Sequence, residues 1–405
     1  MTTAFPLAGL RVVAFEQAVA GPLATRHLAD AGAEIIKIER PEGGDFGRHY
    51  DTSVNGQSAY FVWLNRGKRS LAIDLKAPGA DEITRRLVDS ADVVLQNLAP
   101  GALDRLGFGY KAVRAKKPGV IYCNISGYGQ DGPYRDKKAF DLLLQGESGL
   151  ISVTGTPDFS AKVGISVCDI SAGMYAFSTI LLALRTRDLT GQGDVIDISM
   201  LESMADWMSP FAYFYTFADR KLPRAGMRHN VIVPYGVYKC GDGLLVNMAV
   251  ENPRQWARLC EVVLERPDLV NDPRFNANEK RVQNRSELEP LIEAQLGRLT
   301  QTDAIDLLER ADIPNGRVND VEALARHEQL AARGRWHEFE SEVGPLTLLG
   351  HPMNLASMPQ RTDRIPALGE DSEAIVSELG FSADEVQALR VRGVIGAREG
   401  SHAEP

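Results

Sequence analysis

The sequence predicts an α/β protein in which a doubly wound parallel sheet is joined to a smaller α+β domain. Three observations lead to this prediction. Apolar strand patterns alternate with helical patterns as far as Ser126. A hairpin pattern and three amphipathic segments follow after residue 224. The chain has 405 residues, too many for one ordinary core, and its hydrophobic content of 44% is normal for globular proteins.

The N-terminal part carries the sheet. Its expected strands are Leu10–Phe15, Glu34–Glu39, Leu71–Leu75, Val93–Asn97 and Val120–Ser126, and its expected helices include Gly21–Gly32 and Asp81–Ser90. Parallel sheets bind ligands beyond the carboxyl ends of their strands. These ends are Glu16-Gln17, Arg40-Pro41, Lys76, Asn97-Leu98 and the loop Ser126–Tyr134. A ligand site is therefore expected along this edge.

The stretch from Gly164 to Met200 contains a short apolar approach that ends at Asp169, followed by a helical pattern from Ile170 to Leu184. An acid at a helix start has two interpretations. It can cap free backbone N–H groups. It can also serve as an ionised nucleophile. This stretch alone favours the cap, and both interpretations stay open at this point.

The later chain changes character. An aromatic stretch, Met204–Ala218, is expected to be core or an interface. Two strands around the Gly241–Gly243 turn and helices at Asn252–Glu265, Glu287–Leu299 and Thr302–Ala311 are then expected. A strand pair from Val343, a helix at Ser372–Leu379 and frayed residues after Val394 complete the chain. The expected boundaries are 1–205 for the first part of the large domain, 206–223 for a linker, 224–321 for the small domain and 322–405 for the return to the large domain.

Composition and charge argue against several classes of protein. A net charge of −9 argues against nucleic acid or an anionic membrane surface as a partner. No signal peptide and no apolar stretch of membrane-spanning length are expected. The four cysteines lack CxxC spacing, which favours reduced, buried thiols in a cytoplasmic protein. The seven histidines form no HxxxH or HExxH pattern, and no GxSxG is present, so neither a metal site nor an α/β-hydrolase is expected.

Phosphate-binding signals point away from nucleotides. The turn after the first strand, EQAVAGPLA, lacks GxGxxG, and no P-loop is present. The GxGxxG string Gly127–Gly132 leads into Pro133 and a charged stretch, so it is interpreted as a loop. Five cations lie at or just past strand ends: Arg40, Lys76, Arg105, Lys137 and Lys138. Together they suit a polyanionic ligand with several phosphates.

Several motifs, in order, resemble the class III CoA-transferases. They are LAGLRVVAFEQAVAGPLATRHLADAGAEIIKIERPEGGDFGR, NRGKRSLAIDLK, ADVVLQNLAPGALDRLGFGY, ISGYGQDGPY, TGQGDVIDISMLES, RHNVIVPYGVY and IPNGRVNDVEAL. The resemblance extends to about Leu379. It implies a Rossmann-like large domain built from both chain ends, a small middle domain and an interlocked homodimer. Acyl-CoA and carboxylate are the implied substrates, with coenzyme A entering as substrate and no permanently bound cofactor.

The resemblance also implies roles for individual residues. Asp169 matches the transferase nucleophile, and Gln17 matches a residue that orients the reacting groups. The positions that match CoA-binding residues are Arg40, Ile73, Lys76, Asn97, Leu98, Ala102, Arg105, Lys138 and Ala139. The expected acyl pocket includes Arg48, His49, Tyr50 and Phe140, and Arg48 is a candidate partner for a remote carboxylate.

Three functions remain open on the sequence. The first is transfer of CoA from succinyl-CoA to a C4–C5 dicarboxylate such as itaconate or mesaconate, through an aspartyl anhydride and an aspartyl-CoA thioester. The second is a 2-methylacyl-CoA racemase of the same superfamily. Racemases place a histidine where this chain has Phe140, before Asp141, so one of the two proton-transferring bases is missing. The third, a non-catalytic CoA-binding protein, is disfavoured by Asp169 together with Gln17.

Overall fold

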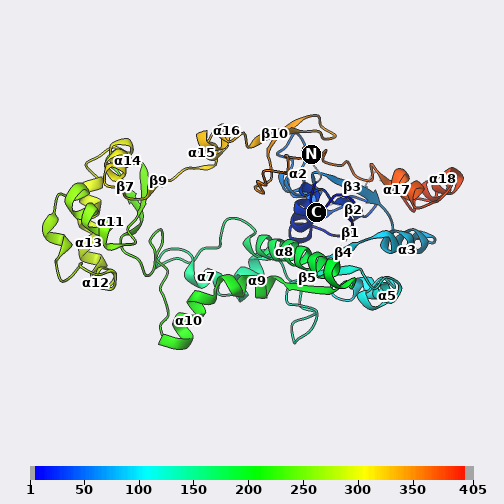
Figure 1. Ribbon diagram of the computed structural model, residues 1–405, viewed down its shortest axis with the longest axis horizontal. Coiled ribbons are helices and arrows are strands. Elements are labelled where there is room, and N and C mark those ends of the chain that lie inside the picture. The colour runs from blue at the N-terminus through cyan, green and yellow to red at the C-terminus, as the bar shows by residue number, and fades with distance from the viewer. Residues whose placement is uncertain (1–4, 397–405) are drawn as a thin grey trace. The chain divides into compact units, whose positions relative to one another are not determined.

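The computed structural model of the chain describes residues 5–396 (Figure 1). The chain divides into two compact units. The large unit contains Met1–Ser148, Gly164–Ser209 and Leu330–Pro405, and the small unit contains Gly149–Val163 and Pro210–Gln329. The domain boundaries expected at residues 205, 224 and 321 remain a prediction, because compactness does not show which segments fold independently.

The large unit is built on a six-stranded parallel sheet with the order β3-β2-β1-β4-β5-β6. Its strands are β1 Arg11–Phe15, β2 Glu34–Glu39, β3 Lys68–Ala72, β4 Val93–Gln96, β5 Ile121–Ser126 and β6 Val195–Ser199. This confirms the expected parallel α/β sheet. The sixth strand was not expected, because its side chains alternate between exposed and buried at the sheet edge and so lack a continuous apolar run.

The helices of the large unit follow the alternation in the sequence. They are α1 Ala20–Asp30, α2 Ala59–Asn65, α3 Ala80–Ser90, α4 Ala102–Arg105, α5 Tyr110–Lys116, α6 Asp141–Glu147, α8 Val167–Thr190, α9 Met200–Trp207, α17 Ser372–Glu378 and α18 Ala383–Val391, with a 3₁₀ turn, η1, at Phe46–His49. Helices α3, α5, α17 and α18 share one hydrophobic cluster with the sheet. Helix α8 packs against α1, β5 and β6.

Helix α8 corrects one expectation. Its 24 residues, with a mean hydropathy of 1.6 over an 18-residue window, are long and apolar enough to cross a membrane, although no such stretch was expected. Half of that window is buried inside the protein. At Gly173 the packing is so close that an added Cβ would lie 2.7 Å from the Ala20 carbonyl oxygen. The helix is therefore the core helix of the large unit, and its hydropathy reflects burial against α1 and the sheet.

The small unit has its own sheet and core. Its elements are α7 Leu150–Val153, α10 Ser209–Ala218, β7 Tyr235–Lys239, β8 Leu245–Ala249, α11 Pro253–Arg258, a π-helical turn η2 Leu259–Val263, a 3₁₀ turn η3 Pro267–Val270, α12 Asn278–Gln283, α13 Arg285–Leu296, α14 Gln301–Arg310, β9 Asn315–Arg317 and α15 Val321–Ala325. Helix α16, Glu328–Ala332, contains the point in the chain where the small unit ends and the large unit resumes. The antiparallel sheet β7-β8-β9 includes the expected hairpin. Its core gathers around Trp256, Phe275 and Leu288.

Two later expectations need correction. The strand pair is β10 Trp336–Phe339 with β11 Leu346–Leu349, so one strand precedes the predicted start at Val343. The helix expected over Asn252–Glu265 is divided between α11 and η2. Most of the frayed tail expected after Val394 lies outside the described residues.

Candidate functional site

Gln17 and Asn97 meet at the carboxyl edge of the sheet. They follow the adjacent strands β1 and β4. From this pair the chain adds β2 and β3 on one side of the sheet and β5 and β6 on the other. The Gln17 N–H donates to Asn97 Oδ1 at 2.9 Å, and Asn97 Nδ2 donates back to the Gln17 carbonyl at 2.8 Å. This is the switch point where open parallel sheets bind ligands. Asn97 thus holds the backbone of the turn that carries Gln17.

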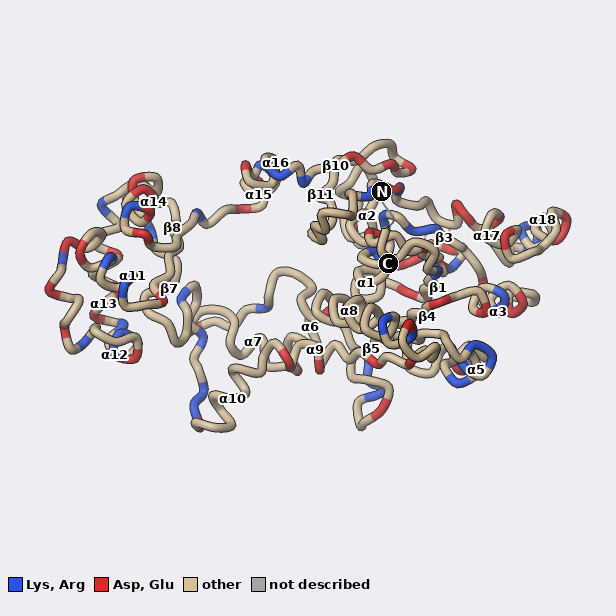
Figure 2. Tube along the Cα trace, viewed as in Figure 1, with Lys and Arg blue, Asp and Glu red and all other residues tan. Residues whose placement is uncertain are grey.

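The predicted CoA-binding residues surround the same edge. Arg40 follows β2 and donates to the Gly44 carbonyl, Leu98 packs on the core, and Lys76 is exposed beyond β3. Ile73 is buried and bonds through its backbone N–H to the Glu39 carbonyl. Figure 2 shows lysine and arginine along the loop that extends from β5. The ends of four strands therefore contribute predicted contacts to one edge.

Two guanidinium groups meet beside Gly101. An added Cβ at Gly101 would lie 3.2 Å from Arg105 Nη1 and 3.5 Å from Arg135 Nη2. Gly101 precedes α4, whose first residue is the predicted contact Ala102, and has a φ of +73°, a conformation that glycine adopts without strain. Arg135 was not a predicted site residue, although it stands three positions before Lys138. Arg135 is therefore a further arginine beside the predicted contact Arg105.

The segment after the β5 loop is held close to the sheet. An added Cβ at Gly127 would lie only 2.2 Å from the Ala139 Cβ, so Gly127 allows this segment to approach. Lys138 is exposed, and the side chain of Phe140 is 66% exposed. The next residue, Asp141, begins α6.

Asp169 lies inside the first turn of α8 and is not its cap. Helix α8 begins at Val167, and the residue before it, Ser166, makes no side-chain capping bond. The N–H of Cys168 instead donates to Asp141 Oδ1 at 2.8 Å, with a longer contact of 3.4 Å from the Asp169 N–H. Gln145 Nε2 donates to the other oxygen at 2.7 Å. The capping interpretation of Asp169 is wrong, because Asp141 occupies these amides.

The environment of Asp169 disfavours its charge. Burial and the neighbouring Asp141 raise its pKa from 3.8 to about 7. Both effects act in the direction opposite to the helix dipole, which favours an anion at a helix start. Burial, Asp141 and Asp169 together raise the pKa of Cys168 to about 12. All four cysteines are free and buried, which confirms the prediction that they are buried.

Tyr50 lies within electrostatic reach of Asp169. Burial, Asp45 and Asp169 raise the pKa of the Tyr50 phenol to about 12, although 46% of the residue is exposed. Tyr50 packs edge-on against Tyr60, at 5.6 Å between ring centroids. Ile170, next to Asp169, joins the hydrophobic cluster that also includes Tyr60. Asp169 thus contributes to the electrostatic environment of the Tyr50 phenol.

Arg48 and His49 are already engaged. Arg48 donates to both carboxylate oxygens of Glu39, at 2.8 and 2.7 Å, and its guanidinium lies over the Phe61 ring. His49 Nε2 is 2.7 Å from the Gly43 carbonyl oxygen. Arg48 is therefore a structural anchor of this loop in the structure, and binding a substrate carboxylate would require it to leave Glu39.

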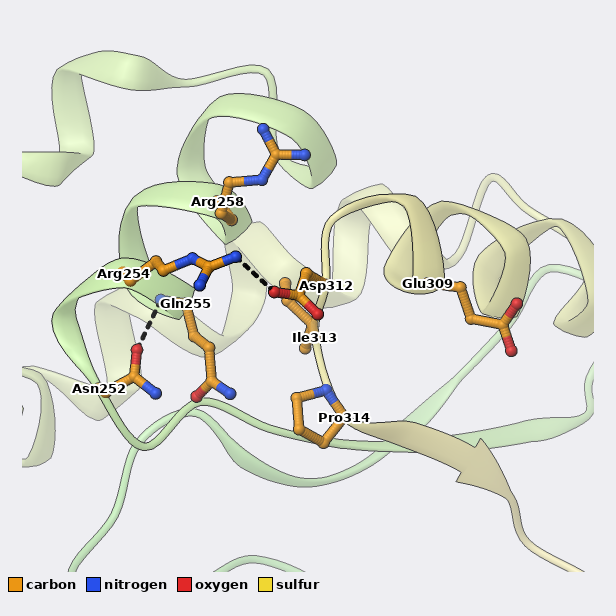
Figure 3. Close-up of a pocket in the computed structure, with 8 residues that line it drawn as sticks. All are labelled: Asn252, Arg254, Gln255, Arg258, Glu309, Asp312, Ile313 and Pro314. Atoms are coloured by element: carbon orange, nitrogen blue, oxygen red, sulfur yellow. Dashed lines mark hydrogen bonds and ion pairs between the residues drawn. The ribbon is translucent and has the colours of Figure 1, made fainter.

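Two pockets lie within the small unit. One, of about 400 Å³, is lined by Asn252, Arg254, Gln255, Arg258, Glu309, Asp312, Ile313 and Pro314 (Figure 3). Its exposed Arg254 pairs with Asp312 at 2.8 Å. The other, of about 510 Å³, includes His229, whose Nδ1 accepts N–H groups from Val231 and Ile232. Neither pocket contains a residue predicted for the site. In the described chain, no three histidine, cysteine or acidic side chains gather as a metal site would require.

Comparison with known proteins identifies the family. The model of the family described as CoA-transferase family III matches residues 7–372. The chain belongs to CoA-transferase family III. It is 36% identical over 384 residues to succinate–glutarate CoA-transferase from Agrobacterium fabrum, covering 92% of this chain and 96% of that protein. It is 31% identical to succinyl-CoA–D-citramalate CoA-transferase from Chloroflexus aurantiacus, covering 96% of this chain and 98% of the relative.

A solved structure agrees with this assignment. A CAIB/BAIF family protein from Brucella suis has a TM-score of 0.80 and 34% identity, covering 92% of this chain and 99% of that one. The family III resemblance is confirmed, and the protein is a CoA-transferase enzyme that uses CoA thioesters. The strand-end cations and Asp169 therefore belong to a family III transferase fold.

Proposed function

We propose that this family III enzyme transfers CoA from succinyl-CoA to a C5 dicarboxylate, with Asp169 as the nucleophile. One observation carries the covalent role: Asp141 occupies the first amides of α8, so the Asp169 carboxylate is not needed as a cap. The similarity to transferases named for glutarate and D-citramalate supports a dicarboxylate acceptor. Itaconate and mesaconate are further members of the same substrate class.

The chemistry needs no outside energy source, because every bond exchanged is activated. The Asp169 carboxylate attacks the succinyl thioester carbonyl, and the C–S bond breaks to give a mixed anhydride and CoA thiolate. The thiolate attacks the aspartyl carbonyl, which releases succinate and leaves an aspartyl-CoA thioester. The acceptor carboxylate attacks this thioester, giving a second anhydride and thiolate. The thiolate then attacks the acceptor carbonyl and restores Asp169.

The other site residues have positioning roles in this proposal. Gln17 and nearby backbone N–H groups stabilise the oxyanion that forms at each carbonyl. The predicted CoA-binding set is Arg40, Ile73, Lys76, Asn97, Leu98, Ala102, Arg105, Lys138 and Ala139, and Arg135 is added because it lies beside Gly101 with Arg105. Tyr50 and Phe140 face the acyl group, and Arg48 and His49 support the loop that leads to Tyr50.

We also propose that the enzyme is an interlocked cytoplasmic homodimer. Helix α10 buries none of its side chains within its own chain, and Phe217 is 82% exposed. Exposed aromatic side chains on one helix suit a subunit interface. Light scattering during gel filtration should give twice the chain mass, whereas a monomer would contradict the dimer.

A panel of acceptors tests the function. The enzyme is incubated with succinyl-CoA and glutarate, itaconate, mesaconate, D-citramalate or oxalate, and new thioesters are measured. Transfer to at least one C5 dicarboxylate is expected to be fastest. Exclusive transfer to oxalate would contradict the proposed acceptor. Deuterium entering the α-carbon of 2-methylacyl-CoA without any transfer would favour the racemase instead.

Trapping tests the nucleophile. After incubation with succinyl-CoA, hydroxylamine should modify Asp169, and mass spectrometry should locate the adduct. Asp169→Ala should lose transfer and the adduct while still binding CoA. Asp188→Ala, near the other end of the same helix, is the matched control and should retain both. Full turnover by Asp169→Ala would refute the covalent role, and neither transfer nor adduct in the wild type would favour a binding protein.

A further inference from the structure

Four buried charged side chains form a network directly behind the Gln17–Ala18 turn. The side chains of Glu16, Lys37, Asp45 and Lys68 are completely buried. Lys37 Nζ lies 2.8 Å from Asp45 Oδ2 and 3.4 Å from Glu16 Oε1. Lys68 Nζ lies 2.7 Å from the same Glu16 oxygen. Opposite charges are paired throughout, as the low dielectric of a protein interior requires.

Asp45 connects this network to two backbone segments of the site. Its Oδ1 accepts the Ala18 N–H at 3.0 Å and the Gly47 N–H at 2.8 Å. Ala18 adjoins Gln17, whereas Gly47 lies in η1, the turn that leads to Tyr50. One carboxylate oxygen therefore holds together the turn that carries Gln17 and the loop whose tyrosine lies near Asp169.

The Ala18 backbone needs such a restraint. Ala18 has a φ of +62°, in the left-handed region that is unfavourable for residues with a Cβ. Strained backbone of this kind persists only where surrounding contacts maintain it. The bond from the Ala18 N–H to Asp45 is such a contact, and a charged acceptor makes it stronger than a neutral one.

Lys37 is the cationic partner of Asp45 in this network. Burial by itself would lower the pKa of Lys37, but Asp45 and then Glu16 raise it, so the ammonium stays protonated. Burial would raise the pKa of Glu16, but Lys68 and Lys37 lower it. Burial lowers the pKa of Lys68 to about 7, so of the two lysines Lys68 holds its proton less firmly.

We propose that Asp45 is a positioning residue for acyl transfer, with Lys37 as its buried counter-ion. Asp45 fixes the Gln17–Ala18 turn and the loop of Tyr50 relative to each other, so that both face the reacting carbonyl in one arrangement. A one-ångström misplacement of such groups is costly for catalysis. This inference rests on the proposed function, because it assumes that Asp169 and Gln17 act on an acyl-CoA.

The competing explanation is that the network only stabilises the fold. Asp30 and Arg66 provide the matched control. The buried Arg66 guanidinium donates two hydrogen bonds to the Asp30 carboxylate, from Nε at 2.9 Å and from Nη2 at 2.8 Å. Arg66 also donates to the Leu349 carbonyl. Among the described residues, neither side chain of this pair bonds to the Gln17–Ala18 turn or to η1. Asp30→Asn should therefore lower the melting temperature without changing the reaction rate.

The experiment compares Asp45→Asn, Asp30→Asn and the double variant Lys37→Met/Asp45→Asn with succinyl-CoA and glutarate. We expect Asp45→Asn to lower kcat at least tenfold while the KM for succinyl-CoA changes less than about threefold. Asp30→Asn should keep kcat within twofold of the wild type. The double variant also removes the buried lysine that has lost its Asp45 partner, so it should recover melting temperature while kcat stays low.

Ala18→Gly provides a test that a structural role would not pass. Glycine adopts the left-handed conformation without strain. Adding Ala18→Gly to Asp45→Asn should therefore recover kcat at least threefold. The inference is overturned if Lys37→Met/Asp45→Asn recovers kcat together with melting temperature. It is also overturned if adding Ala18→Gly to Asp45→Asn leaves kcat unchanged. Loss of all transfer in the wild type would instead refute the proposed function.

Discussion

At the scale of single residues, two neighbouring carboxylates have separate tasks. Asp141 accepts the N–H of Cys168 and a bond from Gln145, so its charge is used to begin α8. Asp169 lies in the turn that Asp141 caps and is left available for chemistry. The same closeness that positions Asp169 also makes it harder to ionise, because both groups are negative.

The pH dependence of the reaction should report this pair. Because the pKa of Asp169 is about 7, kcat/KM for succinyl-CoA should rise about tenfold per pH unit below pH 7 and level off above it. Tyr50 and Cys168, two further titratable groups in the surroundings of Asp169, have pKa values of about 12 and stay neutral in this range.

Asp141→Asn should shift the midpoint of this profile to lower pH. Asparagine keeps an oxygen for the Cys168 N–H but removes the charge that raises the pKa of Asp169. Rates measured from pH 5.5 to 8.5 provide the test, with Asp188→Asn on the far end of α8 as control. An unchanged midpoint in Asp141→Asn would show that burial alone sets the pKa.

At the scale of elements, the packing of α8 on α1 depends on Gly173. An added Cβ there would meet the Ala20 carbonyl oxygen at 2.7 Å and the Leu23 Cβ at 3.0 Å. Side-chain volume at this point would push the helix that bears Asp169 away from the helix that follows Gln17. Gly173 therefore allows α8 and α1 to pack closely, although glycine has a low helix propensity.

Gly173→Ala should destabilise the protein by about 1–3 kcal/mol because of this overpacking. Gly146→Ala, in α6, is the matched control, since an added Cβ there meets nothing within 4 Å. That control should be neutral or stabilise by up to about 1 kcal/mol. Urea unfolding of both variants measures the difference, and equal stabilities would contradict the close-packing argument.

At the scale of the whole molecule, burial of charged and titratable groups links stability to pH. His27 in α1 is buried beside Arg26, and burial and then Arg26 lower its pKa from 6.5 to about 3. Between pH 6.5 and about 3, His27 therefore stays neutral in the folded protein, whereas it is protonated in the unfolded chain. The contribution of neutral His27 to the free energy of unfolding is therefore fully present above pH 6.5 and is lost as the pH falls from 6.5 towards 3.

His27→Gln should remove this part of the acid sensitivity. The difference between 6.5 and about 3 corresponds to at most about 5 kcal/mol at the acid end. Unfolding free energies of both proteins are compared between pH 8 and pH 4, since glutamine does not titrate there. The stability gap between variant and wild type should narrow or reverse as the pH falls, and parallel curves would contradict the assignment to His27.

Much of the architecture follows from local patterns that do not depend on distant contacts. The apolar runs at Val12–Ala14, Ile35–Ile36 and Val93–Leu95 are buried on both faces, so they predict a parallel sheet from the chain alone. Edge strand β6 could not be predicted in this way, because one of its faces is exposed and its sequence lacks a continuous apolar run. Helix α18 has a capping box at Ser382 and Glu385 that could have predicted it.

The carboxyl edge and its candidate residues could also be anticipated, because strand ends in a parallel sheet meet by topology and the family motifs name the positions. Which partner each side chain takes depends on folding. The bonds that α8 amides donate to Asp141 and that Arg48 donates to Glu39, and the approach of Arg135 to Gly101, join segments whose spacing in the chain carries no periodic signal. Charge and pKa depend on those distances and on burial, so the state of Asp169 emerged only once the chain was folded.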